Sequence, residues 1–160
     1  MNVIDLQVLT DLPGQPLPGQ LQTWVDSVLH ECKQPANLVI RIVDESEGAL
    51  LNAQYRGKNG PTNILSFPFE QPEGIDFAAE NADLSHYLGD LVICSPVIAQ
   101  EAESQGKALT DHWAHIVIHG VLHLLGFDHL KAQDADIMEA KEIAILKKLN
   151  INNPYCEENS

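Results

Sequence analysis

The chain has 160 residues, of which 44% are hydrophobic, and this is sufficient for one domain with a packed core. Its formal net charge of -14 at pH 7 argues against a nucleic-acid partner held by general electrostatics, because such domains are usually basic. No apolar run approaches the roughly 20 residues that a membrane-spanning helix needs.

The number and spacing of the cysteines indicate whether the protein lies in a reducing or an oxidising compartment. Cys32, Cys94 and Cys156 are odd in number and show no C-x-x-C spacing, and no secretory apolar segment follows Met1. We therefore expect free thiols in a reducing environment, in a soluble, cytoplasmic protein.

The first part of the chain predicts alternating strands and helices, with a Pro- and Gly-rich turn at Asp11–Gly19. The expected strands are Val3–Leu9, Asn37–Asp44 and Ile64–Phe69, the last with Pro68 suited to an edge or a bulge. One helix is expected from the helical spacing of Leu21, Trp24, Val25, Val28 and Leu29. A second, Ser46–Tyr55, is expected to turn Leu50 and Leu51 inward.

The second part predicts a long acidic loop, one more strand and three helices. The loop is Gln71–Tyr87, and the strand is Leu91–Cys94, entered through Gly89 and Asp90. The helices are Val97–Ser104 after a Ser95-Pro96 cap, Asp111–Leu125 capped by Thr110, and Ala135–Leu149. The order predicts a single α+β domain over residues 1–150, with a mixed four-stranded sheet, about five helices and a loose tail at 151–160.

The segment H-G-V-L-H-L-L-G-F-D-H begins at His119 and predicts a metal site at the end of a central, buried helix. His119 and His123 are four residues apart, so a helix presents them on one face. Gly126 is suited to end that helix in a left-handed turn that brings His129 back toward the pair. Three imidazoles leave the fourth position of a tetrahedral zinc ion open, as in catalytic sites.

Other assignments near this segment stay open. His115 and His119 are also four apart and could be a rival ligand pair, although the position of Gly126 favours the second pair. We expect His115 to have a structural role or to support a ligand. Asp128 could orient a ligand, act as a base or be a turn residue.

The histidine spacing is also that of the metzincin peptidases, but the glutamate that serves them as base would stand at position 120, which is glycine. Phosphodiester cleavage suits the residues better, because zinc acidifies a bound water and polarises a phosphoryl oxygen, and the additional requirement is a cation for the developing charge. The chain has two arginines: Arg41 lies within a strand, whereas Arg56 lies at a helix end in a Gly-rich turn. Any polyanion must use a local positive focus, for which Arg56, Lys58 and a bound metal ion are the candidates.

The histidine segment resembles the signature of the YbeY family of bacterial endoribonucleases. Two further segments resemble that family in the same order, namely Y-R-G-K-N-G-P-T-N-I-L-S-F-P from Tyr55 and L-G-D-L-V-I from Leu88. Together the three matches cover Leu51 to roughly Glu142. Phe127, where tyrosine is also usual, is a mild departure.

The resemblance implies one zinc ion bound by His119, His123 and His129, and cleavage of single-stranded RNA with Arg56 as the catalytic arginine. It also implies maturation of the 3′ end of 16S ribosomal RNA and ribosome quality control, with the ribosome as partner and no DNA or membrane partner. Two alternatives remain: a metzincin-like zinc peptidase, and a non-catalytic ribosome-assembly factor with a structural metal.

Overall fold

The computed structural model describes residues 2–10, 14–30, 36–57, 60, 62–68, 87–127 and 132–151. Within these ranges the strands are β1 (Val3–Val8), β2 (Asn37–Val43), β3 (Ile64–Pro68) and β4 (Tyr87–Cys94). The helices are α1 (Pro18–Leu29), α2 (Glu45–Arg56), α4 (Ser95–Gln105), α5 (Leu109–Leu124) and α6 (Ala132–Lys148). The predicted α+β domain is confirmed, while the tail at 152–160 and all of the acidic loop except Tyr87 lie outside the described residues.

The four strands form one mixed sheet in the order β1-β2-β4-β3. Strands β1, β2 and β4 are parallel, and β3 runs antiparallel to β4 at the edge of the sheet. The expected edge position of Pro68 is therefore confirmed. A proline has no N–H to donate to a neighbouring strand, and at an edge that position can face solvent.

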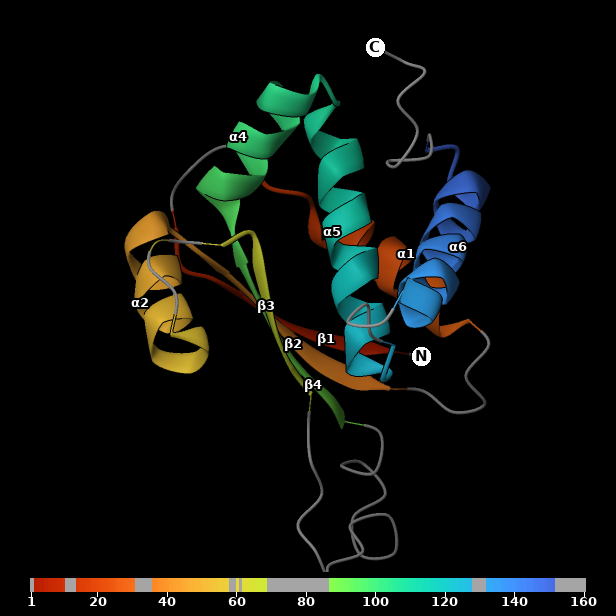
Figure 1. Cartoon of the computed structure of the whole chain (residues 1–160), viewed down its shortest axis with the longest axis horizontal. Helices are drawn as coiled ribbons and strands as arrows, with labels where there is room; N and C mark the ends of the chain where they lie inside the picture. Colours follow the sequence, from red (N-terminus) through yellow and green to blue (C-terminus); the bar gives the residue numbers. More distant parts are fainter. Residues whose placement is uncertain are drawn as a thin grey trace, which may run out of the picture.

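Helices cover both faces of the sheet (Figure 1), with α1 and α5 on one face, α6 outside them, and α2 on the other face. The side chains of β4 alternate between these faces, as a strand requires. Leu91 and Ile93 belong to the main core on the α5 side, and Val92 and Cys94 belong to a smaller cluster with Leu51 on the other side. Strand β4 is thus buried on both faces, which explains its apolar sequence.

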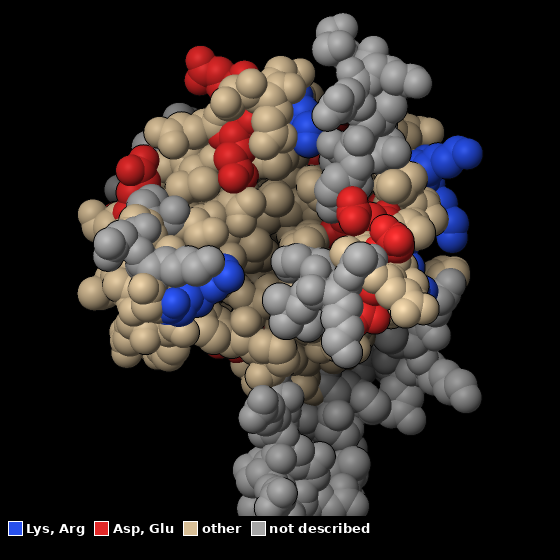
Figure 2. Space-filling model, viewed as in Figure 1, with Lys and Arg blue, Asp and Glu red and all other residues tan. Residues whose placement is uncertain are grey.

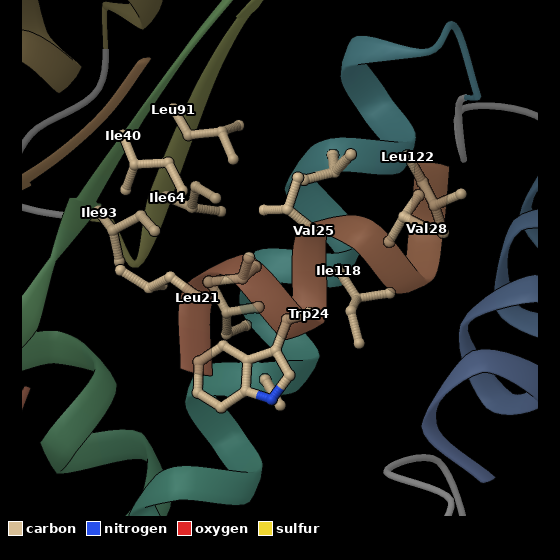
Figure 3. Packing of buried hydrophobic residues seen from close by; sticks show 14 of the residues in the cluster. Leu21, Trp24, Val25, Val28, Ile40, Ile64, Leu91, Ile93, Ile118 and Leu122 are labelled. Atoms are coloured by element: carbon tan, nitrogen blue, oxygen red, sulfur yellow. The ribbon is translucent and has the colours of Figure 1, made fainter. Parts of the chain in front are cut away.

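Helix α5 lies at the centre of the main core, where it crosses α1 over the sheet (Figure 3). Its residues Val117 and Val121 are fully buried, and the ring of Trp113 is 1% exposed. Gly120 allows the close approach of α5 to the sheet. A Cβ at this position would lie 2.6 Å from Ile64 Cδ1 and 2.9 Å from Leu91 Cδ2, closer than carbon atoms pack.

Several predicted boundaries are wrong for identifiable reasons. Strand β4 begins four residues early, at Tyr87, because Gly89 and Asp90 pair with β2. Helix α5 begins at Leu109 after Ala108, so Thr110 lies within its first turn and is not its cap. Leu50 is 64% exposed and does not turn inward. The core between α2 and the sheet is a small cluster that includes Leu51 but not Leu50.

Helix α4 begins at Ser95 itself, so this residue lies inside the helix rather than capping it. Cys94 is a buried free thiol, as expected, and burial raises its pKa. The other two cysteines lie outside the described residues. None of the helices in the described ranges combines the length and the apolar character that crossing a bilayer requires.

Candidate metal centre

The two histidines at the end of α5 converge on one point. The Nε2 atoms of His119 and His123 lie 3.1 Å apart, and their ring centroids lie 4.6 Å apart with the ring planes at 77°. Helix α5 ends directly after them, because Gly126 has a φ of 102° and the Phe127 N–H donates to the Leu122 carbonyl at 3.1 Å. The predicted left-handed turn at Gly126 is confirmed.

The spacing of the two Nε2 atoms suits a zinc ion. Zinc–nitrogen bonds of about 2.0–2.1 Å in tetrahedral geometry place two ligand nitrogens about 3.3 Å apart. The observed 3.1 Å is close to this value. His119 is 23% exposed, so the pair is also accessible from solvent. The chemistry and the geometry of these donors therefore fit the metal that the sequence predicts.

A buried carboxylate supports the pair from α6. Glu142 is fully buried and makes a hydrogen bond with Nδ1 of His119. Its other oxygen lies 3.8 Å from Nε2 of His115. Because a carboxylate only accepts hydrogen bonds, Nδ1 of His119 carries the hydrogen, and the lone pair of Nε2 is available to a metal.

His115, His119 and Glu142 form a second group that could hold a metal ion, since one ligand atom from each lies within 4.8 Å of the others. In this group His119 would use Nδ1, the atom that bonds Glu142, rather than Nε2. Burial lowers the pKa of His115, although the Glu142 carboxylate opposes this effect. His115 is therefore a neutral imidazole at pH 7 and is able to act as a ligand or as a supporting group.

The remaining predicted site residues are less fully placed. His129, Asp128 and Lys58 lie outside the described residues. Arg56 is the last residue of α2, whose N-terminus is capped by the Asp44 side chain and whose C-terminus is closed by Gly57 with a φ of 65°. The side chain of Arg56 is exposed.

Arg56 forms no hydrogen bond or ion pair with any of the described residues, whereas Arg41 donates from Nε to Gln7 at 3.1 Å. Lys and Arg side chains lie at separate points on the face shown in Figure 2, around a central hollow. The Arg56 guanidinium is therefore available to an anion.

The packing of Gly120 bears on the peptidase alternative. This glycine directly follows His119, where a metzincin has its glutamate. A side chain here would run into Ile64 and Leu91 in the core, so it could not point toward the two histidines. The α5 helix therefore has no room for a catalytic glutamate at this position. A metzincin-like peptidase mechanism would lack the general base that this glutamate supplies.

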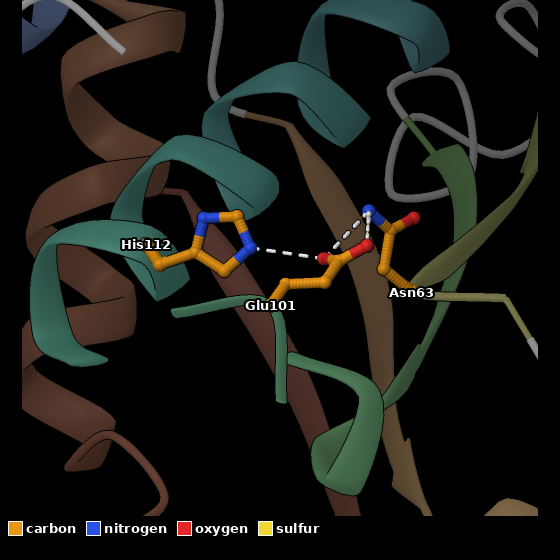
Figure 4. Close-up of polar contacts among 3 residues, drawn as sticks. All are labelled: Asn63, Glu101 and His112. Atoms are coloured by element: carbon orange, nitrogen blue, oxygen red, sulfur yellow. Dashed lines mark hydrogen bonds and ion pairs between the residues drawn. The ribbon is translucent and has the colours of Figure 1, made fainter. Parts of the chain in front are cut away.

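A polar network joins the start of β3 to α4 and α5 (Figure 4). The Asn63 side chain donates to the two carboxylate oxygens of Glu101, at 3.1 and 3.4 Å, and Nε2 of His112 lies 2.9 Å from the nearer oxygen. His112 is 3% exposed, so this contact is protected from solvent. Asn52 of α2 also donates to the Gly60 carbonyl at 2.8 Å. Among the described residues after Arg56, Gly60 is thus bonded to α2 and Asn63 to α4, and α4 is bonded in turn to α5.

Sequence reasoning did not identify Glu142, Glu101, His112 or Asn63 as functional candidates. For Glu142 a signal existed: it lies on the apolar stripe of α6 formed by Met138, Ile145 and Leu146. A carboxylate among such residues needs a partner, because an unpaired buried charge is costly. Met138 on this stripe is 1% exposed and lies in the core.

The fold and the site define a class, namely α+β domains that carry a histidine-rich candidate metal centre on a central helix. The comparisons are more specific. The model of the family described as Endoribonuclease YbeY matches residues 14–150. This chain belongs to that family.

Three curated relatives carry the name Endoribonuclease YbeY. The protein of Colwellia psychrerythraea is 50% identical, with 98% of this chain and 99% of the relative covered. That of Methylococcus capsulatus is 51% identical, with 89% and 88% covered. That of Alteromonas mediterranea is 50% identical, with 88% and 84% covered.

A solution structure of a Thermotoga maritima protein has a similar fold. Its TM-score is 0.57 at 20% sequence identity, and the match covers 97% of this chain and 99% of the other. At this identity the likeness concerns the fold alone.

Proposed function

We propose that the chain is a zinc-dependent endoribonuclease that cleaves single-stranded RNA. The observation that carries the proposal is the convergence of His119 and His123 at 3.1 Å in a member of the Endoribonuclease YbeY family. The motif resemblance extends the proposal to maturation of the 16S ribosomal RNA 3′ end and to ribosome quality control, with the ribosome as partner.

The proposed ligands are Nε2 of His119, Nε2 of His123 and His129. Two described features support this set over His115, His119 and Glu142. The Nε2 spacing suits zinc, and Gly126 ends α5 three residues before His129. Glu142 is in direct hydrogen-bond contact with Nδ1 of His119, the nitrogen that does not face His123. Glu142 is then a positioning residue that fixes the ring of His119.

When bound, zinc polarises a phosphoryl oxygen and makes a coordinated water more acidic. The chain supplies the remaining interactions. Arg56 is proposed as the catalytic arginine, which binds the scissile phosphate and offsets the negative charge that develops on it. Gly57 ends α2 directly after Arg56, and within the same helix the Asn52 side chain donates to the Gly60 carbonyl. The guanidinium is thus carried by a well-anchored helix end.

Cleavage of a single-stranded fragment from the 16S ribosomal RNA 3′ region tests the proposal. The wild type is expected to cleave it after zinc loading, and a duplex of the same sequence is expected to remain intact. Arg56→Ala and His119→Ala are expected to lose at least about a hundredfold in rate, as for removal of one charge-stabilising group.

Arg41→Ala is the matched control for the arginine, because Arg41 is bonded to Gln7 within the sheet and is expected to leave cleavage unchanged. Equal activity of the wild type, Arg56→Ala and His119→Ala would exclude this catalytic site. Full ribosome binding by Arg56→Ala, with no cleavage by any form and unfolding on chelation, would instead support a non-catalytic assembly factor with a structural metal.

A further inference from the structure

A pocket of about 240 Å³ lies between α1, α5 and α6, apart from the candidate metal centre. Its apolar lining comes from Val28, Leu122, Leu125 and Ile145. Two cations, Lys141 and Lys148, line it from α6. The volume is near the lower end of small-molecule sites, which are about 300–1,000 Å³. The pocket is thus of a size for one flat ring system rather than for a larger ligand.

The charge around this pocket is opposite to that of the whole protein. In a chain of net charge -14, no acidic side chain is found among the described residues that line it. Between Lys141 and Lys148 the only acidic residue of α6 is Glu142, and that side chain is fully buried against His119. The outer surface of this half of α6 is therefore positive, and it suits an anion with an apolar part.

An aromatic ring stands beside one of the cations. The Lys141 ammonium lies 5.2 Å from the centroid of the Phe127 ring, within the range of a cation–π contact. Phe127 also lines the pocket. Phe127 is partly buried against the core, so its ring offers only its pocket side to a ligand. An aromatic side chain next to a lysine is a usual combination for single-stranded nucleic acid, in which the base meets the ring and the phosphate meets the cation.

Residues that line the pocket are next in sequence to residues of the candidate metal centre. Leu122 lines the pocket, and its neighbour His123 belongs to the metal centre. In the same way Lys141 lines the pocket, and its neighbour Glu142 supports His119. The last turn of α5 and the middle of α6 thus contribute side chains to both sites. Neighbouring residues of a helix point in different directions, so the two sites lie on different sides of these helices.

We infer that this pocket binds one nucleotide of the single-stranded RNA, at a position beyond the phosphate that is cleaved. The base occupies the apolar part beside Phe127, and Lys141 and Lys148 bind the flanking phosphates. The inference rests on the proposed function for the identity of the strand. It also offers a way for a strongly acidic protein to hold RNA, since Lys141 and Lys148 give the strand a local positive focus in addition to Arg56, while the acidic remainder of the chain repels nonspecific nucleic acid.

The test is fluorescence anisotropy of a labelled ten-nucleotide single-stranded RNA. Every protein carries Arg56→Ala, so that the strand remains intact. Lys148→Ala is expected to weaken binding by about threefold to tenfold and to reduce the slope of log K against log salt by about 0.7, the value for one phosphate on a single strand. Lys141→Ala is expected to have the same effect. Ala144→Glu adds a negative charge at the pocket and is expected to weaken binding more than either lysine variant.

Lys147→Ala is the matched control. Lys147 precedes Lys148 on the same helix and is exposed, but it does not line the pocket, so less than a twofold change is expected. An equal loss in Lys147→Ala and Lys148→Ala would show a general charge effect and overturn the pocket. Unchanged RNA binding in Lys148→Ala and Ala144→Glu would also overturn the proposed nucleotide pocket. The same holds if a polyglutamate peptide binds in the pocket without displacing the RNA.

A failure of the proposed function is distinguished by a separate cleavage assay of the same strand with the wild type. If the zinc-loaded wild type leaves the strand intact, the endoribonuclease proposal fails, whereas the binding measurements still decide whether the pocket takes RNA.

Discussion

Glu142 of α6 is fully buried, and its carboxylate makes a hydrogen bond with Nδ1 of His119 in α5. This contact joins two helices, α5 and α6, that come together only when the chain folds. It sets the tautomer of His119 and directs Nε2 toward Nε2 of His123. The candidate metal centre is therefore organised by a residue 23 positions away in sequence.

Glu142→Gln is expected to lower zinc affinity by about tenfold to a hundredfold, because an amide is a weaker acceptor than a carboxylate and orients His119 less firmly. Competition with a chromogenic chelator measures the affinity. Glu139→Gln on the same helix is the control and is expected to bind zinc as the wild type does. Wild-type affinity in Glu142→Gln would show that the contact has no role in metal binding.

The sequence predicts those features that depend on local pattern. Helix α5 is predicted within two residues at its start because its apolar residues, such as Trp113, Val117 and Val121, recur at helical spacing over sixteen residues. The convergence of His119 and His123 is likewise predicted by their spacing.

Features that depend on contacts between distant segments are not predicted. Gly89 and Asp90 are poor strand formers, and they extend β4 only because Leu38 and Val39 of β2 pair with them. The contact of Glu142 with His119 requires that α6 pack on α5 at one particular rotation, which no local pattern specifies. The network of Asn63, Glu101 and His112 has the same origin.

Zinc is expected to raise the melting temperature through His119 and His123. At a free zinc concentration of about 100 times Kd, binding stabilises the fold by about 2.7 kcal/mol. For a protein of this size that is a shift of roughly 5–10 °C. Differential scanning fluorimetry with and without zinc measures it.

Two variants decide which donors hold the ion. His123→Ala is expected to abolish the thermal shift, and His115→Ala to retain most of it. The reverse result would place the ion between His115, His119 and Glu142, the second group that could hold it. His30→Ala is the control for a histidine outside both groups.

Gly120→Ala is expected to destabilise the protein, although alanine is the better helix former. Helix propensity favours alanine over glycine by about 0.8–1.0 kcal/mol. Overpacking a core costs about 1–3 kcal/mol, and the new methyl would meet Ile64 and Leu91. The net loss is expected to be about 1 kcal/mol in urea unfolding.

Gly19→Ala is the matched control, because a Cβ at this position in α1 meets nothing within 4 Å. It is expected to be neutral or to stabilise by about 0.4 kcal/mol. If both variants stabilise the protein equally, the close approach of α5 to the sheet does not require glycine.

Glu101 is expected to make stability depend on pH in the acid range. Burial raises the pKa of this carboxyl, but hydrogen bonds from His112 and Asn63 outweigh burial and bring the pKa below its ordinary value of 4.5. A carboxyl with a lower pKa in the folded state contributes stability above its unfolded pKa, and this contribution is lost as pH falls through the folded pKa. The free-energy difference between wild type and Glu101→Gln should therefore shrink as pH falls from about 5 to about 3.

Urea unfolding at several pH values measures this difference. Glu103→Gln on the same helix is the control: Glu103 is exposed, so its effect should be small at every pH. A difference for Glu101→Gln that stays constant down to about pH 3 would mean that the His112 and Asn63 contacts do not favour the charged carboxylate. Protonation of Glu101 weakens its contacts with Asn63 and with His112 at once, so the links of α4 to the start of β3 and to α5 are expected to weaken together.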